Sequence, residues 1–126
     1  MISIDALGPG GPYRTRNREA ITTVAGEPIA ELSLVPPLYV SRAISAQRRT
    51  RPLPVAQRRA ALARAAEAFT DAVIAGLDFP AYVELASRVS GLPIRVARAA
   101  ALRVGEAVGT AWDAVRPAQP VGSALN

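Results

Sequence analysis

The side chains that most enzymes use for catalysis are missing from this sequence. None of its 126 residues is a cysteine, a histidine or a lysine, which leaves ten carboxylates, fifteen arginines and scattered hydroxyl groups for chemistry. Without these residues the chain has no thiolate nucleophile, no side chain that titrates near neutral pH and no Schiff-base amine. A serine without a base to activate it is usually a surface hydroxyl. We therefore assign no catalytic residue.

The sequence also contains no ligand set for a metal ion or a nucleotide. Its carboxylates do not pair at helical spacing on an apolar cleft face, and the histidine and cysteine ligands typical of zinc are absent. The run Gly8-Pro9-Gly10-Gly11-Pro12 is glycine-rich like a phosphate-binding loop, but its prolines lack the N–H donors that such a loop needs. We assign no metal-binding and no cofactor-binding residue, and we expect the chain alone to bind neither.

Positive charge is concentrated in one stretch of the chain. The net charge is +5, and residues 42–64 contain no acid but contain seven arginines: Arg42, Arg48, Arg49, Arg51, Arg58, Arg59 and Arg64. Such a cluster can bind the phosphates of a nucleic acid or a nucleotide. No aromatic residue is interleaved with these arginines, as it would be in a single-strand binder. The favoured interpretation is a solvated face, or one that pairs with acids on a partner.

The N-terminal third of the sequence predicts a β-hairpin. Residues 1–12 are expected to form a flexible Gly/Pro segment, and residues 13–126 a single domain or part of one. The β-branched residues of 13–24 and 27–35 favour two strands joined at Ala25-Gly26, where Gly26 can adopt positive φ. Two strands alone are marginally stable, so the hairpin must lie against helices or join another sheet.

Prolines and glycines divide the rest of the chain into four predicted helices. They span residues 38–49, residues 55–75, a short segment from the Asp78 N-cap to Ser90, and a long segment that starts at Pro93 and continues until Pro117. The predicted fold class is therefore α+β: mostly α, with about four helices and a small N-terminal hairpin.

The last predicted helix carries the most regular apolar pattern. Residues recur at spacings of three and four along it: Ile94, Ala97, Ala101, Val104, Val108, Ala111 and Val115. The pattern favours a core face, and a coiled-coil dimer seam is the alternative. Gly105 and Gly109 form a G-x-x-x-G pair, which permits a second helix to approach closely.

A second functional interpretation comes from residues 82–104. Helix, turn and helix resemble a helix-turn-helix motif, with Arg95, Arg98 and Arg103 on the second helix available for DNA. Against this interpretation stand the length of that helix and the lack of Asn or Gln near its start.

Taken in order, these elements resemble the N-terminal segment of the aldehyde dehydrogenase superfamily, which includes acyl-CoA reductases. The resemblance covers residues 13–126 and rests on three stretches: the hairpin around Val24 to Leu32, the helix containing Gln57-Arg58-Arg59-Ala60-Ala61-Leu62, and the Leu85 to Val115 helix pair with its Ser90-Gly91-Leu92-Pro93 turn. In that family, the last of these helices leads into the nucleotide-binding sheet.

The resemblance implies a partial domain of an NAD(P)-dependent oxidoreductase that is inactive alone. The family's catalytic cysteine, catalytic glutamate and cofactor-binding residues lie beyond the matching region, and Asn126 falls where the nucleotide-binding strands should begin. We therefore expect a non-catalytic fragment or subunit that scaffolds the enzyme and self-associates or contacts a downstream catalytic chain.

A cytoplasmic location is expected, because the first 12 residues do not resemble a signal peptide and no stretch resembles a membrane span. A small DNA-binding regulator and a dimerising helical adaptor are the alternatives, and only the first would bind nucleic acid.

Overall fold

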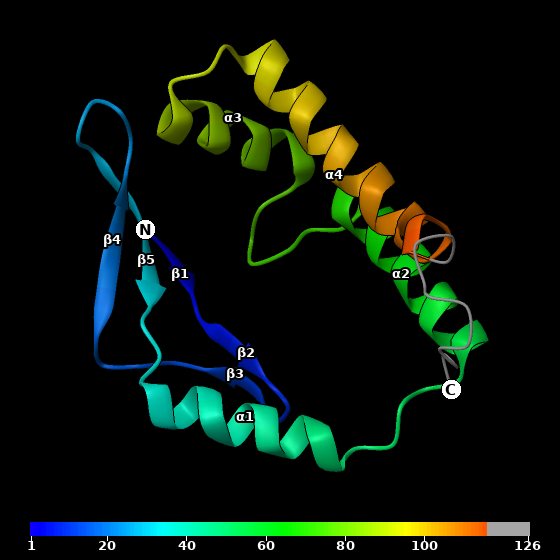
Figure 1. The fold of residues 1–126 in the computed structure, drawn as a ribbon. Coiled ribbons are helices and arrows are strands. Elements are labelled where there is room, and N and C mark those ends of the chain that lie inside the picture. The colour runs from blue at the N-terminus through cyan, green and yellow to red at the C-terminus, as the bar shows by residue number, and fades with distance from the viewer. Residues whose placement is uncertain (116–126) are drawn as a thin grey trace. The chain divides into compact units, whose positions relative to one another are not determined.

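The computed structural model describes residues 1–115 and shows four helices with several short strands (Figure 1). This confirms the predicted fold class, mostly α within an α+β arrangement. The chain divides into two compact units, whereas the sequence analysis predicts one domain over 13–126. The first unit comprises Met1–Arg51 together with Arg88–Gly91, and the second comprises Pro52–Ser87 together with the residues from Leu92 onward.

The predicted hairpin is present in the first unit, with shorter strands. Strand β4 (Arg18–Thr22) pairs antiparallel with β5 (Pro28–Ser33). Gly26 has the positive φ expected of it, 82°, and the Thr23 hydroxyl accepts a hydrogen bond from the Glu27 backbone N–H at 3.2 Å. The turn therefore closes as the sequence predicts.

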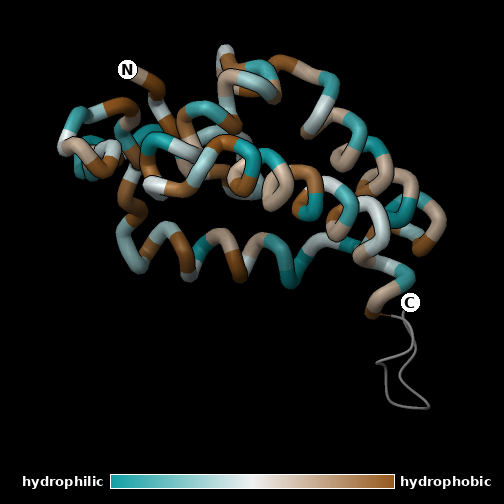
Figure 2. The backbone as a smooth tube through the Cα atoms, turned by 90° about the horizontal axis from the view of Figure 1, so that it is seen from above, coloured by the Kyte–Doolittle hydropathy of each residue, from teal (hydrophilic) through white to brown (hydrophobic). Residues whose placement is uncertain are grey.

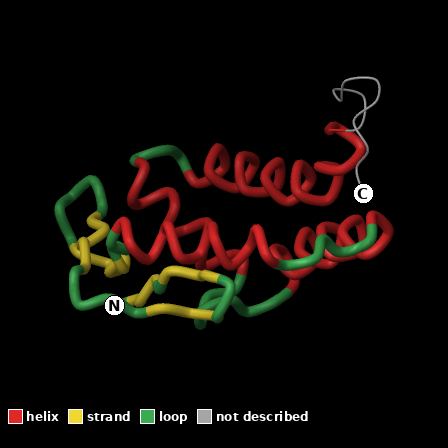
Figure 3. Tube along the Cα trace, turned by 60° about the horizontal axis from the view of Figure 1, so that its bottom comes forward, coloured by secondary structure: helices red, strands yellow, loops and turns green. Residues whose placement is uncertain are grey.

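Residues 1–13 form three short strands where the sequence analysis expects a flexible Gly/Pro segment over residues 1–12. Strand β1 (Ile2–Ile4) pairs parallel with β5, which gives the sheet order β1-β5-β4. Strands β2 (Ala6–Gly8) and β3 (Gly11–Tyr13) form a separate two-stranded sheet (Figure 3). The prolines of this segment are tolerated because Pro9 lies in the turn and Pro12 lies in a strand with one partner.

Helix α1 (Pro37–Arg49) completes the first unit and agrees with the predicted helix at 38–49. It begins at a proline, whose missing N–H has no partner to lose in the first turn. None of its residues is buried. The helix contacts the β2–β3 sheet through Tyr39, whose ring stacks on that of Tyr13.

The second unit contains α2 (Val55–Asp71), most of α3 (Phe79–Ser90) and α4 (Ile94–Val115). Helix α2 ends four residues before the predicted end at 75, because a tight turn follows it in which Ala75 and Gly76 both have positive φ (52° and 81°). Asp78 caps α3 as predicted: its Oδ1 accepts a hydrogen bond from the Ala81 N–H at 2.9 Å.

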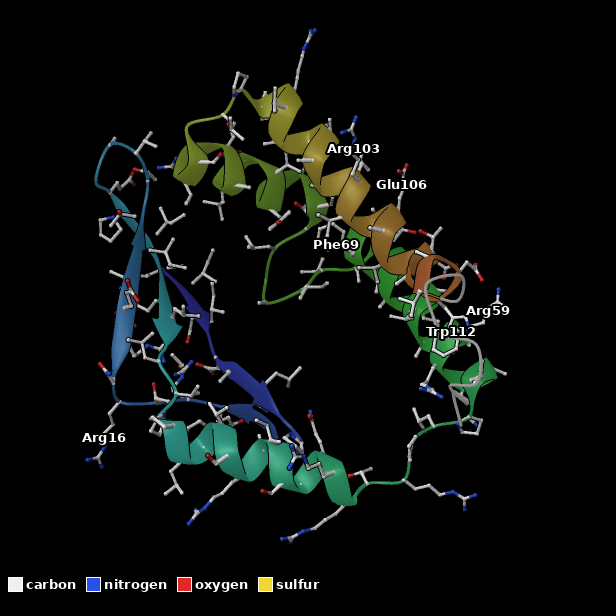
Figure 4. All side chains as sticks on the ribbon, viewed as in Figure 1. Arg16, Arg59, Phe69, Arg103, Glu106 and Trp112 are labelled. Carbon is white, nitrogen blue, oxygen red and sulfur yellow. The ribbon has the colours of Figure 1, made fainter. Side chains whose placement is uncertain are left out.

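The core of the second unit is small. Its buried residues are Phe79 and Val83 of α3 and Ala97 and Ala101 of α4. Phe69 of α2 packs at the edge of this core, with its ring centroid 5.7 Å from that of Phe79 (Figure 4). Because two of these four side chains are alanines, the core contributes modest hydrophobic stabilisation.

Helices α2 and α4 cross closely at the G-x-x-x-G pair. A Cβ added to Gly109 would lie 3.3 Å from the Ala66 Cβ, and one added to Gly105 would lie 3.4 Å from the Phe69 Cδ1. Alanine and glycine therefore provide the space that the sequence analysis ascribes to this motif.

The predicted apolar seam of α4 is only partly a core face. Ala97, Ala101 and Gly105 are buried, whereas Ile94 and Val104 are about half exposed. The close crossing at the glycines moves the buried stripe to a spacing of four residues, away from the predicted alternation of three and four. Apolar residues recur between polar ones along the helices (Figure 2), and part of that apolar surface is left uncovered.

Candidate functional site

The described residues contain no group of three or more acidic, histidine or cysteine side chains that could hold a metal ion. The glycine-rich turn from Gly8 to Pro12 connects two antiparallel strands and does not begin a helix. Two of its five residues are prolines, which lack N–H donors. The turn therefore does not fit the phosphates of a nucleotide cofactor.

The arginine cluster of residues 42–64 is divided between the two units. Arg42, Arg48 and Arg49 lie on α1 of the first unit, followed by Arg51, and the remaining three lie on α2 of the second unit. The cluster that the sequence shows as one block therefore belongs to two separately packed parts.

The α1 arginines are exposed, and within the described part of the chain neither they nor Arg51 form an ion pair. Arg48 and Arg49 lie in the last turn of α1, where a positive charge interacts favourably with the helix dipole. This interaction with the helix dipole is a physical reason for arginine at positions 48 and 49. Arg42 lies in the middle of the helix and has no such role.

Two of the α2 arginines connect α2 to α4. The Arg58 guanidinium carbon lies 5.1 Å from the centroid of the Trp112 ring, a cation–π contact. Arg59 forms an ion pair with Asp113 at 3.1 Å, and Figure 4 shows Arg59 and Trp112 close together at this end of the unit. These arginines therefore support helix packing. From the sequence alone, an arginine with this role cannot be distinguished from one that binds phosphate.

A pocket of about 310 Å³ lies in the first unit between the β2–β3 turn and α1. Its lining is mostly apolar and includes Pro9, Pro12, Tyr39 and Ala46, and Arg42 also contributes to it. The sequence analysis does not predict this pocket, because it treats the turn as part of a flexible segment.

Two close contacts shape the pocket. The Tyr13 and Tyr39 rings stack with their centroids 4.4 Å apart and an interplanar angle of 16°. A Cβ added to Gly8 would clash with the Tyr39 hydroxyl oxygen, so a larger residue at this position would have to displace the Tyr39 ring.

A polar network in the first unit is the most connected group of charged residues that the structure describes. Arg18 of β4 donates from Nη2 to the Ser3 hydroxyl at 2.6 Å and to the Glu31 carbonyl at 3.1 Å. Its Nε lies 3.0 Å from Glu31 Oε2, an ion pair whose geometry is not that of a hydrogen bond. Arg16, two residues earlier, extends away from the unit (Figure 4).

Asp5 accepts hydrogen bonds within the same network. The Ser33 hydroxyl donates to its Oδ1 at 3.2 Å, and Arg14 Nε lies 3.3 Å from the same oxygen. Desolvation raises the pKa of Asp5, but hydrogen bonds from Arg14, Ser3 and Arg18 and the Arg14 charge outweigh it and hold the pKa below 3.8. The network joins three strands and contains no activated nucleophile, so we interpret it as structural.

The arginines proposed for DNA contact lie on α4. Arg95, Arg98 and Arg103 are exposed, and Arg103 lies with Glu106 on the outer side of the helix (Figure 4). Between them, Ala97 and Ala101 are buried in the core. Helix α4 is therefore both a packing helix and a carrier of exposed positive charge.

With this geometry in view, the chain was compared with known proteins. No protein-family model and no curated protein matches it. None of the helices among residues 1–115 combines the length and the apolar character needed to cross a membrane.

Proposed function

We propose that this chain is the non-catalytic N-terminal segment of an oxidoreductase resembling the NAD(P)-dependent aldehyde dehydrogenases and acyl-CoA reductases. It acts in the cytoplasm as a scaffold and as a contact segment for the catalytic part or for other subunits. The chain supplies no catalytic residue and no cofactor ligand of its own.

The observation that carries the proposal is the order of elements. A hairpin with a glycine turn is followed by α1, α2, a short α3 that ends beside Gly91, and a long α4. This is the order that the resemblance implies. Gly91 has φ of 71°, a conformation in which glycine ends helices, so the turn that the resemblance places there has a physical basis.

Uncovered apolar surface gives a second line of support. On α1, Leu38 is 60% exposed and Ile44 is 45% exposed, and on α4, Val96 and Val104 are about half exposed. Apolar surface of this kind on two helices is expected where another part of a larger enzyme packs. The same feature would serve the dimerising adaptor, so it supports association without identifying the partner.

In this proposal, the residues that bind the cofactor and carry out the reaction belong to another part of the enzyme. When bound, NAD(P) would accept a hydride from the substrate, but the only glycine-rich turn within residues 1–115 does not fit its phosphates, and no residue of this chain is cysteine. We therefore derive no catalytic step through the cofactor from these residues.

The first experiment is to translate the genomic DNA downstream of the Asn126 codon in all forward frames and to co-express the encoded polypeptide with this chain. We expect a frame that contains a glycine-rich nucleotide-binding turn and a catalytic cysteine. We also expect aldehyde-dependent NAD(P) reduction from the co-expressed protein and none from this chain alone.

An unrelated downstream gene after a genuine stop codon would overturn the proposal, as would a catalytic polypeptide whose activity and solubility are the same without this chain. In either case the DNA-binding and adaptor interpretations would become the leading ones.

A further inference from the structure

The pocket beside α1 combines two features that point to a partner. Its walls are mostly apolar, and Arg42 is a cation without an acidic partner among the described residues. Arg49 follows Arg42 by seven residues, which places both on the same side of α1. The pocket therefore has an apolar lining next to Arg42, with Arg49 farther along the same side of α1, and neither arginine forms an ion pair among the described residues.

The size and lining of the pocket argue against a nucleotide. A volume of about 310 Å³ is at the lower end of the range for small-molecule sites, which is roughly 300–1,000 Å³. The pocket can accommodate an apolar side chain, and its proline-containing turn offers few N–H donors to phosphate. An apolar side chain of a peptide segment fits these properties better than a dinucleotide.

The positive charge of α1 restricts which surface can occupy the pocket. Residues 37–51 contain four arginines and no acid. A second copy of this chain would bring the same net charge of +5, and the α1 helices of the two copies would repel each other. A nucleic acid could pair with the arginines but would leave the apolar pocket unfilled, and Tyr39 is already stacked on Tyr13 and not free to stack on a base.

We propose that the pocket between the β2–β3 turn and α1 docks a segment of the catalytic part of the enzyme that presents an apolar side chain beside one or more carboxylates. The apolar side chain enters the pocket next to Tyr39, and the carboxylates pair with Arg42 and Arg49. This inference rests on the proposed function and identifies one place where the two parts meet.

The test uses the complex of this chain with the co-expressed downstream polypeptide, purified through a tag on this chain. Ala46→Trp fills the pocket from an exposed position, and Arg42→Glu reverses the charge at its edge. Ser41→Trp adds the same ring at an exposed α1 position that does not line the pocket, and Arg95→Glu makes the same charge change on α4. Circular dichroism of each variant confirms that the helices are retained.

We expect A46W and R42E each to weaken the complex at least about tenfold, as for residues at the centre of an interface, and S41W and R95E to change it less than about twofold. Raising the salt concentration should weaken the wild-type complex more than the R42E complex.

The possible failures are distinguishable. If the wild-type chain forms the complex and A46W and R42E do so equally well, or if S41W weakens it as much as A46W, the docking inference is overturned and the proposed function stands. If the wild-type chain forms no complex, both are overturned. If the wild-type chain instead binds duplex DNA tightly at physiological salt and R42E abolishes that binding while R95E does not, the α1 arginines serve nucleic acid and the docking inference is wrong.

Discussion

At the scale of single residues, the same side-chain type has different roles in the two units. Arg18 is largely buried in a hydrogen-bond network, Arg59 pairs with Asp113, and Arg42 has no acidic partner among the described residues. From the sequence alone, these three arginines are equivalent positive charges on a basic protein. Only the structure separates arginines that hold strands and helices together from those available to a partner.

The Asp5 network gives a pH-dependent prediction. Because the folded-state pKa of Asp5 lies below its usual 3.8, its stabilising effect is complete above that value and is lost as the pH falls through the folded-state pKa. We expect the thermal unfolding midpoint of the wild-type chain to fall more steeply below about pH 4 than that of Asp5→Asn. At pH 7 the variant should be the less stable of the two.

Thermal unfolding followed by circular dichroism between pH 2.5 and 7 would measure this difference. Glu19→Gln is the matched control, because Glu19 is an exposed carboxylate on β4 that makes no contact with Asp5 in the network. Parallel curves for the wild-type chain and Asp5→Asn would mean that the network does not hold in solution.

At the scale of elements, the helices could be predicted because proline and glycine mark their ends. Pro37 begins α1, Asp78 caps α3, and α4 begins at Ile94, one residue after the predicted start at Pro93. The predicted end of this helix at Pro117 lies outside the described residues. The error at the end of α2 arises because Ala75, and not only Gly76, adopts positive φ. Alanine rarely adopts that conformation, so the sequence gives no warning of the turn.

The strands of the first 13 residues could not be predicted for a different reason. Strand β1 is held by β5, which lies 26 residues later at its start, and no local pattern specifies such a pairing. The pocket beside α1 depends on these strands. Its arginines were therefore visible in the sequence as exposed charge, while its apolar walls were not.

The crossing of α2 and α4 gives a prediction about packing. Replacing Gly109 by leucine places a side chain where a Cβ alone would lie 3.3 Å from the Ala66 Cβ. We expect Gly109→Leu to lower the free energy of unfolding by about 1–3 kcal/mol, the usual cost of overpacking. Urea unfolding followed by circular dichroism would measure it.

Ala107→Leu is the matched control, because Ala107 is an exposed position two residues away on the same helix. Its effect should stay within about 0.5 kcal/mol, as for most surface substitutions. Equal stabilities of the two variants would show that α2 and α4 do not approach each other closely at Gly109.

At the scale of the whole molecule, the net charge of +5 attracts polyanions whether or not the chain recognises DNA. The two interpretations differ in where the charge matters. Non-specific attraction depends on net charge, whereas a helix-turn-helix depends on the arginines near the start of its second helix. Two charge-reversed variants can separate them.

R95E/R98E changes the start of α4 and R48E/R49E changes the end of α1, and each variant lowers the net charge from +5 to +1 because each substitution removes two charges. We expect the wild-type chain to bind labelled duplex DNA only at low salt, with a dissociation constant no tighter than about 10⁻⁶ M at physiological salt. Both variants should weaken this binding equally in fluorescence anisotropy titrations across a range of salt concentrations. Selective loss in R95E/R98E, together with tight wild-type binding at physiological salt, would instead establish α4 as a recognition helix, and the oxidoreductase proposal would then give way to the regulator.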